Sequence, residues 1–249
     1  MKNNEPIISV RGLEARYGEK VILSDIDLDI FPGQLTVILG SSGCGKTTML
    51  KAITRLVEPT KGSIKYWGEE ITEMDENHFQ KVLKKVGMLF QGGALLNSLN
   101  VFENIAIPLE QHTHLSPALI ERIIRVKLSL VKLGDVMHLM PSELSGGMKK
   151  RVALARAIVL DPKILFCDEP SAGIDPLTSS HLDELLLELK RKLNMTIVVV
   201  THELASIHRI ADRIIFLDNG RLIFQGDLAA AKQAHIPSID TFFRSGRYD

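Results

Sequence analysis

The chain has 249 residues, and its 30 Lys and Arg balance 30 Asp and Glu, so the formal net charge is zero. This length suits one large domain or two small ones. A zero net charge, with only nine Phe, three Tyr and one Trp, argues against nucleic-acid binding, which needs clustered positive charge and stacking rings. Two cysteines are too few for a disulfide framework and favour a reducing cytosol. No stretch approaches the roughly 20 apolar residues that span a bilayer, so an integral membrane protein is not expected.

Short apolar runs alternate with longer amphipathic stretches, which predicts an α/β fold with a mainly parallel sheet covered by helices. The predicted strands are Ile7–Val10, Val21–Ile30, Leu35–Leu39, Ser63–Trp67, Val86–Phe90, Lys163–Cys167, Thr196–Val200 and Arg213–Asp218. The clearest helices are Lys46–Leu56, Leu119–Leu133, Gly147–Leu160 and Leu177–Leu193. The N-terminal strands alternate with polar residues and favour an antiparallel piece, whereas the strands at 35–39, 164–167 and 197–200 are continuously apolar, as central parallel strands are.

The organisation predicts one domain over residues 1–249, without internal repeats or long linkers. Between Gln91 and about Leu160 the pattern is almost wholly helical, which indicates a helical subdomain at about 92–160 inserted into the α/β core. Asn219-Gly220 lies between two apolar runs and predicts a tight hairpin turn. From Pro237 the chain is polar and loses its pattern, so a mobile or partner-bound tail is expected at about 237–249.

A phosphate-binding loop follows the apolar strand at 35–39, and it matches the pattern G-x-x-x-x-G-K-[ST] between a strand and a helix. Its residues are Gly40, Ser41, Ser42, Gly43, Cys44, Gly45, Lys46, Thr47 and Thr48. Glycines let backbone N–H groups curl around a β-phosphate, and the following helix adds positive potential. Lys46 is expected to reach the β- and γ-phosphate oxygens and Thr47 to hold Mg²⁺. The alternative is a glycine-rich turn with a helix cap at Thr47. Cys44 is interpreted as a small filler residue, although a helix N-terminus can lower a thiol pKa.

Two carboxylates end the apolar strand at 164–167. Asp168 at the end of a buried parallel strand can order the Mg²⁺ shell, and Glu169 is placed to polarise an attacking water as general base. Without a phosphate loop in the chain, a helix cap or a pairing with lysine would explain them equally well.

Two more polar residues follow strands. His202, after the strand at 196–200, is predicted to contact the γ-phosphate and stabilise charge in the transition state, although a lone histidine there is usually a surface residue. Gln91, after the strand at 86–90, can touch Mg²⁺ or water from a movable loop; alternatively, it is an ordinary polar loop residue.

The sequence Leu144-Ser145-Gly146-Gly147-Met148-Lys149-Lys150-Arg151 resembles the signature motif of the ATP-binding cassette (ABC) ATPases. With it, that family's motifs are complete and in order. The resemblance implies a P-loop NTPase fold with a RecA-like parallel-sheet core, an N-terminal antiparallel β subdomain and a helical subdomain. It adds Asp175 as a nucleotide-site residue and Tyr17 as the aromatic that stacks on adenine, unless Tyr17 is simply a surface aromatic. Met148 replaces the family's usual glutamine and is not an expected contact.

The same resemblance implies a head-to-tail dimer of two copies, in which ATP lies between the phosphate loop of one chain and Ser145, Gly146 and Gly147 of the other. Hydroxyl and N–H groups at a helix N-terminus suit such an anion.

The stretches after Gln91 and around LSGGM narrow the resemblance to ATPases of phospholipid transporters that maintain outer-membrane lipid asymmetry. The implied assembly lies at the cytoplasmic face of the bacterial inner membrane. Its other members are an integral membrane permease dimer, a cytoplasmic STAS-domain protein and a periplasmic lipid-binding protein with a mammalian-cell-entry domain. The mostly apolar segment Gly92–Leu109 is expected to form the groove that receives the permease.

Three other readings compete. An ABC importer for amino acids or another small solute would carry nearly the same motifs. A cassette protein of DNA repair, chromosome structure or ribosome function is disfavoured, because only 54 residues separate Gln91 from Ser145 and leave no room for a long coiled coil. A catalytically dead regulatory cassette is opposed by Lys46, Asp168, Glu169 and His202.

Overall fold

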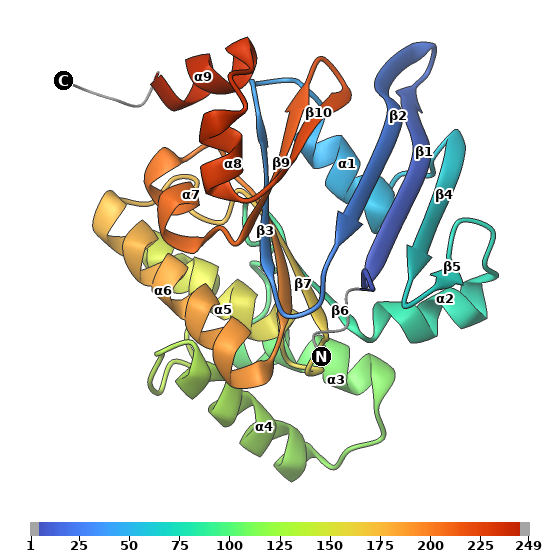
Figure 1. The fold of residues 1–249 in the computed structure, drawn as a ribbon. Coiled ribbons are helices and arrows are strands. Elements are labelled where there is room, and N and C mark those ends of the chain that lie inside the picture. The colour runs from blue at the N-terminus through green and yellow to red at the C-terminus, as the bar shows by residue number, and fades with distance from the viewer. Residues whose placement is uncertain (1–4, 245–249) are drawn as a thin grey trace. The chain divides into compact units, whose positions relative to one another are not determined.

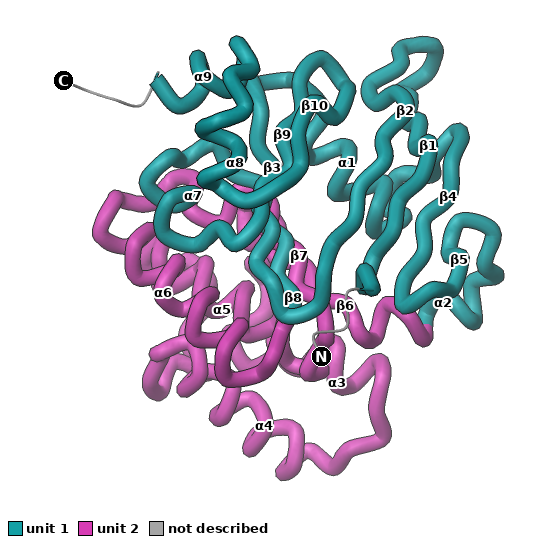
Figure 2. Tube along the Cα trace, in the orientation of Figure 1, with its two compact units in different colours: residues 1–80, 196–249 teal, residues 81–195 magenta. Residues whose placement is uncertain are grey.

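The computed structural model describes residues 5–244 and divides into two compact units (Figures 1 and 2). Unit 1 combines the N-terminal part through Gln80 with the part from Thr196 onward, and unit 2 is residues 81–195. Helix α2 (Glu76–Leu83) runs across the division.

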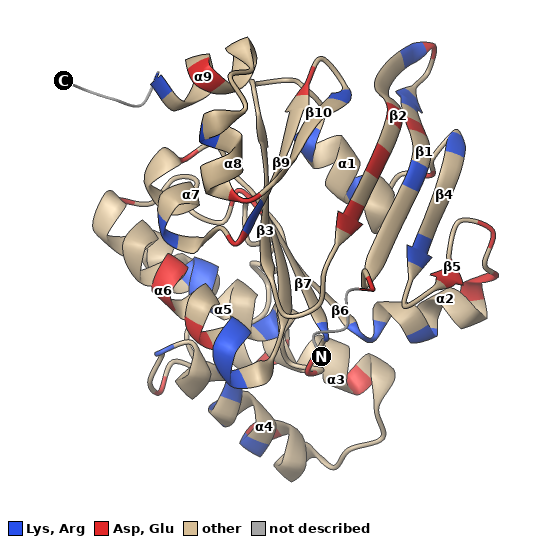
Figure 3. Cartoon of the chain, viewed as in Figure 1, with Lys and Arg blue, Asp and Glu red and all other residues tan. Residues whose placement is uncertain are grey.

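The N-terminal strands of unit 1 form an antiparallel sheet in the order β2-β1-β4-β5, which confirms the predicted antiparallel piece. These strands are β1 (Ile8–Tyr17), β2 (Lys20–Ile30), β4 (Lys61–Tyr66) and β5 (Glu69–Glu70). Strand β1 is longer than the expected Ile7–Val10, because a register shift beyond Val10, where Gly12 has a φ of 55°, breaks the alternation that would reveal it. Acidic residues along β2 neighbour basic residues of β1 (Figure 3), as in the pair of Arg11 with Asp29 at 2.8 Å.

The second sheet of unit 1 carries the phosphate loop. It contains β3 (Leu35–Gly40), β8 (Thr196–Val200), β9 (Arg213–Asp218) and β10 (Arg221–Gly226). Strand β3 is central, since it pairs in parallel with both β8 and β9, and every residue of β3 and β8 is buried. The predicted turn at Asn219-Gly220 joins β9 to the antiparallel β10, with φ values of 46° and 74°.

Four helices of unit 1 are α1 (Lys46–Ile53), α7 (Leu204–Ile210), α8 (Leu228–Gln233) and α9 (Pro237–Arg244). Helix α9 corrects the expectation of a patternless tail from Pro237. Its Ile239 is buried, and the ring of Phe242 packs edge-on against Phe216 at 5.4 Å, so an amphipathic spacing of three residues holds this segment in place. The remainder of the expected tail, 245–249, lies outside the described residues.

Unit 2 contains the parallel pair β6 (Val86–Leu89) and β7 (Ile164–Asp168), and the helices between them confirm the predicted helical insertion. Its helices are α3 (Val101–His112), α4 (Pro117–Leu130), α5 (Gly146–Ala157) and α6 (Pro176–Leu193), with a 3₁₀ turn at Pro141–Glu143. Helix α3 begins with a capping box in which Asn100 and Glu103 exchange hydrogen bonds. Across residues 5–244, none of the helices combines the length and the apolar character needed to cross a membrane.

Candidate active site

The phosphate loop of unit 1 connects β3 to α1, and its glycines are structurally required. Gly40, Gly43 and Gly45 have φ values of 146°, 77° and 105°, a region that other residues rarely adopt. A Cβ atom on Gly40 would lie 2.1 Å from the backbone oxygen of Leu217, and one on Gly45 would lie 2.7 Å from a methyl carbon of Leu23. The backbone can therefore take this tight course only without side chains, which is what close approach to a phosphate demands.

Lys46 lies across this loop at the first turn of α1. Its Nζ donates to the backbone oxygens of Gly40 at 3.0 Å and Ser41 at 2.9 Å, so the ammonium is held beside the loop and remains partly exposed. Thr47 follows it on α1. A cation, a hydroxyl and a helix N-terminus fit a phosphate with its bound Mg²⁺, because phosphate and hydroxyl oxygens are the ligands that Mg²⁺ takes.

Cys44 is buried inside the loop, with 4% of its surface exposed, and its Sγ lies 4.0 Å from Nζ of Lys46. Burial raises the pKa of this thiol, and the opposing effect of Lys46 is smaller. The interpretation of Cys44 as a filler residue is favoured over an activated thiol, because burial outweighs the lowering of the pKa by the ammonium and the backbone N–H of Lys46 at the start of α1.

His202 lies at the same edge of the unit 1 sheet as the phosphate loop. Ile38 of β3 pairs with Val200 of β8, so Gly40 and His202 each lie two residues beyond one rung of a parallel ladder. His202 is exposed. Tyr17 is the last residue of β1 and 50% exposed, as a ring available for stacking would be.

Unit 2 repeats this relationship with its own strands. Leu89 of β6 pairs with Cys167 of β7, so Gln91 and Glu169 each lie two residues beyond the paired rung. Asp168 is buried at the end of β7, with 6% of its surface exposed. Glu169 has a φ of 44°, a left-handed conformation that is costly for a residue with a side chain and that clusters at functional sites. No sequence pattern indicated this backbone strain.

Two cations of α5 hold the segment that follows β6, and sequence reasoning assigned neither a role. The Nζ of Lys150 donates to the backbone oxygen of Gln91, while Arg156 donates to the oxygens of Gly93 and Ala94, both at 2.8 Å. Burial lowers the pKa of Lys150, and the nearby charge of Glu169 opposes that shift. No sequence pattern distinguished Lys150 from the neighbouring cations Lys149 and Arg151.

The signature residues lie at the start of α5. Ser145 is the N-cap, and its Oγ accepts from the N–H of Met148 at 3.2 Å. Gly147 is required here as well, since a Cβ would lie 2.5 Å from Cγ2 of Thr178. Gly146 is the first helical residue and is exposed. A helix N-terminus with a hydroxyl and bare N–H groups is thus open to an anion.

Asp175 has a local role that sequence reasoning missed: it caps α6. Its carboxylate accepts from the N–H groups of Leu177 and Thr178 at 3.1 and 3.0 Å and from the hydroxyl of Thr178 at 2.6 Å. These hydrogen bonds lower the pKa of Asp175, and the hydrogen bond from the Thr178 hydroxyl has the largest effect. The pattern of Asp, Pro and Thr at the start of a helix was the missed signal.

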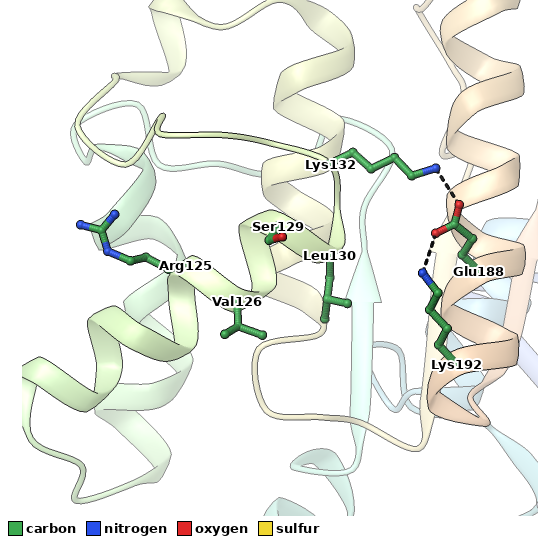
Figure 4. A pocket seen from close by; sticks show the side chains of 7 residues that line it. All are labelled: Arg125, Val126, Ser129, Leu130, Lys132, Glu188 and Lys192. Carbon is green, nitrogen blue, oxygen red and sulfur yellow. Dashed lines mark hydrogen bonds and ion pairs between the residues drawn. The ribbon is translucent and has the colours of Figure 1, made fainter.

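Two cavities of unit 2 lie outside these motifs. One, of about 430 Å³, is lined mainly by apolar side chains of β6, α3 and the segment between them, including Phe90, Leu96 and Ile107. Part of the segment expected to receive a permease, Gly92–Leu109, therefore lines a groove. The other, of about 500 Å³, lies beside α4 and α6, where Glu188 bridges Lys132 and Lys192 at 2.6 and 3.1 Å (Figure 4). No predicted site residue lines either cavity.

Comparisons with known proteins agree with the motifs. The family model described as ABC transporter matches residues 23–172. The chain is 40% identical to the intermembrane phospholipid transport system ATP-binding protein MlaF of Haemophilus influenzae, over 90% of this chain and 84% of that protein. It is 37% identical to the probable ribonucleotide transport ATP-binding protein mkl of Mycobacterium leprae, over 96% of this chain and 69% of that protein. The dimeric structure of MJ0796, a bacterial ABC transporter cassette, superposes with a TM-score of 0.82 at 30% identity, covering 89% and 98% of the two chains.

Proposed function

Since the chain belongs to the ABC transporter family and is an ATPase subunit of a transporter, we propose that its hydrolysis of ATP powers the movement of phospholipids between the inner and outer membranes. One observation carries the choice of cargo: 40% identity over most of both chains to a protein named for intermembrane phospholipid transport. In this proposal the transport maintains the lipid asymmetry of the outer membrane.

In this proposal each site residue has its own role in binding the nucleotide or in hydrolysing it. The N–H groups of Gly40, Ser41, Ser42, Gly43, Cys44, Gly45 and Thr48 surround the phosphates, and Tyr17 stacks on the adenine. Lys46 neutralises charge on the β- and γ-phosphates. Thr47, Asp168 and Gln91 supply oxygen ligands for Mg²⁺, which supplies further positive charge when bound. The burial of Asp168 and the exposed position of Gln91 suit these roles.

Glu169 takes a proton from the attacking water, and His202 stabilises charge that develops on the γ-phosphate. The strained backbone at Glu169 supports its assignment, because strain of this kind persists where the surroundings fix a functional group.

A second copy of the chain supplies Ser145, Gly146 and Gly147 to the nucleotide in a head-to-tail dimer, and Asp175 is a further residue of the nucleotide site. The dimeric structure of the MJ0796 cassette supports the formation of a dimer. ATP binding would favour the closed dimer, and hydrolysis would release it. The membrane partner is a permease dimer seated on the apolar groove at Phe90, Leu96 and Ile107. A STAS-domain protein and a periplasmic lipid-binding protein with a mammalian-cell-entry domain complete the assembly, with this chain at the cytoplasmic face of the inner membrane.

A second candidate is the ATPase of an importer for amino acids or another small solute. The similarity to the protein described as a probable ribonucleotide transport ATP-binding protein favours this second candidate. Purification of the chain with its membrane partners, followed by mass spectrometry of proteins and bound lipids, separates the two. We expect a permease with co-purifying phospholipid. Recovery of a solute permease without lipid would overturn the proposal.

A further inference from the structure

We propose that Lys150 is a positioning residue for ATP hydrolysis: it ties the segment 91–94, named here the Gln91 segment, to helix α5, with Arg156 as the second anchor. The inference rests on the ATPase activity and not on the identity of the cargo.

The Gln91 segment has its backbone held by side chains of α5. Three of its four carbonyl oxygens accept from two cations, that of Gln91 from Lys150 and those of Gly93 and Ala94 from Arg156. Between these anchors a Cβ atom on Gly93 would lie 3.3 Å from Cβ of Ala153, so the segment lies directly against the helix. Lys150, Ala153 and Arg156 are spaced by three residues and therefore share one face of α5.

Burying the charged side chain of a lysine to hold a loop costs free energy. Lys150 is only 7% exposed, and a charge removed from water must be compensated by hydrogen bonds or by opposite charge. Here it has the carbonyl of Gln91 and, nearby, the carboxylate of Glu169. The ammonium of Lys150 therefore donates to the backbone of Gln91 and is also close enough to the proposed general base, Glu169, to feel its charge. An apolar residue at this position would make no hydrogen bond to the Gln91 carbonyl and would leave the Gln91 segment without this anchor.

Helix α5 begins with the signature residues, so Lys150 lies on the same rigid element, five residues after its N-cap Ser145. A displacement at the start of α5 would be transmitted to the Gln91 segment through these three hydrogen bonds. Lys150 therefore acts through the position of Gln91 and not by binding the nucleotide.

The test uses the full-length chain, purified with whatever membrane subunits accompany it. Steady-state ATPase rates give kcat and KM, and binding of a fluorescent ATP analogue gives the affinity. We expect Lys150→Met to lower kcat by about ten- to a hundredfold, as a misplaced catalytic group does, with ATP affinity changed less than about twofold. Lys150→Arg should restore most of kcat, because it keeps a buried donor. Arg156→Lys keeps the charge but loses one of two hydrogen bonds, so it should lower kcat by a smaller factor.

Lys127→Met is the matched control. Lys127 is also a buried lysine of unit 2, 5% exposed, but the structure pairs it with Asp161 and not with a residue of the Gln91 segment. It should lower the melting temperature without the selective loss of kcat. In a Gln91→Ala background, Lys150→Met should have little further effect, because the positioned side chain is already gone.

The inference is overturned if Lys150→Met leaves kcat unchanged, if Lys127→Met lowers kcat equally, or if the effects of Gln91→Ala and Lys150→Met multiply. If Lys150→Met has no effect while Glu169→Gln abolishes hydrolysis, the inference fails and the proposed function stands.

Discussion

The backbone N–H of Gly220 donates to the backbone oxygen of Cys44 at 3.2 Å, so the β9–β10 turn supports the phosphate loop. The oxygen of Gly220 accepts in turn from the N–H of Ser24 at 2.9 Å. A Cβ atom on Gly220 would lie 2.2 Å from the backbone oxygen of Ile22. The turn is therefore wedged between β2 and the loop, and only glycine fits.

Gly220→Ala should destabilise unit 1 and weaken ATP binding. Gly68→Ala is the control, because Gly68 also has a positive φ, 83°, but its Cβ would meet nothing within 4 Å. Both variants carry the cost of a left-handed alanine, about 1 kcal/mol, and Gly220→Ala adds the backbone clash. Thermal unfolding should show the larger drop for Gly220→Ala. Equal drops in melting temperature for the two variants would contradict the steric requirement for glycine at position 220.

Lys46→Ala should lose ATP affinity and hydrolysis together, because the ammonium held beside the loop is the proposed partner of the β- and γ-phosphates. Lys51→Ala, on the same helix but outside the loop, should bind ATP normally. Titration with a fluorescent ATP analogue measures both. Unchanged affinity in Lys46→Ala would contradict the assignment.

Glu169→Gln should keep ATP binding and lower hydrolysis by at least about a hundredfold, as loss of a general base does. The ATP-bound chain should then accumulate as a dimer, detectable by size-exclusion chromatography with light scattering. Glu188→Gln, which removes a carboxylate that bridges two exposed lysines, serves as the control and should hydrolyse ATP normally. Near-normal turnover in Glu169→Gln would remove this residue as the base.

Alkylation of Cys44 should be slow near neutral pH and faster as pH rises. Its raised pKa keeps the thiol protonated where a free cysteine has begun to ionise, and only the thiolate reacts. In a Cys167→Ala variant, the rate of modification from about pH 7 to about pH 9.5, followed by mass spectrometry, should stay below that of free cysteine, and Mg-ATP should lower it further. A fast rate that is independent of pH would show an activated thiol instead.

The raised pKa of Cys44 also makes the free energy of unfolding depend on pH. The folded chain holds the Cys44 proton more tightly than the unfolded chain does. The resulting contribution of Cys44 to the free energy of unfolding is therefore fully present below the ordinary thiol pKa. It is lost as pH rises above that value.

Periodic and motif-bearing elements were predictable from the sequence. The continuously apolar strands β3, β7 and β8 are fully buried, and the glycines of the phosphate loop carry the positive φ values that their motif requires. These features depend on local patterns of apolar residues and glycine, which a sequence displays directly.

Features that depend on tertiary contacts were not predictable. The hydrogen bonds from Lys150 and Arg156 join residues about 60 positions apart, and the left-handed backbone of Glu169 is imposed by its surroundings. Helix α9 was missed because its apolar residues, Ile239, Phe242 and Phe243, are too few to stand out from a polar segment until Phe216 is seen against them.

In the proposed function, ATP hydrolysis by this chain drives the movement of phospholipid. The most direct measurement is ATP-dependent transfer of a fluorescent phospholipid by the purified membrane assembly in proteoliposomes, compared between the native chain and Glu169→Gln. We predict transfer that requires ATP and is abolished in Glu169→Gln. ATP-driven accumulation of a small solute with no transfer of lipid would contradict the account.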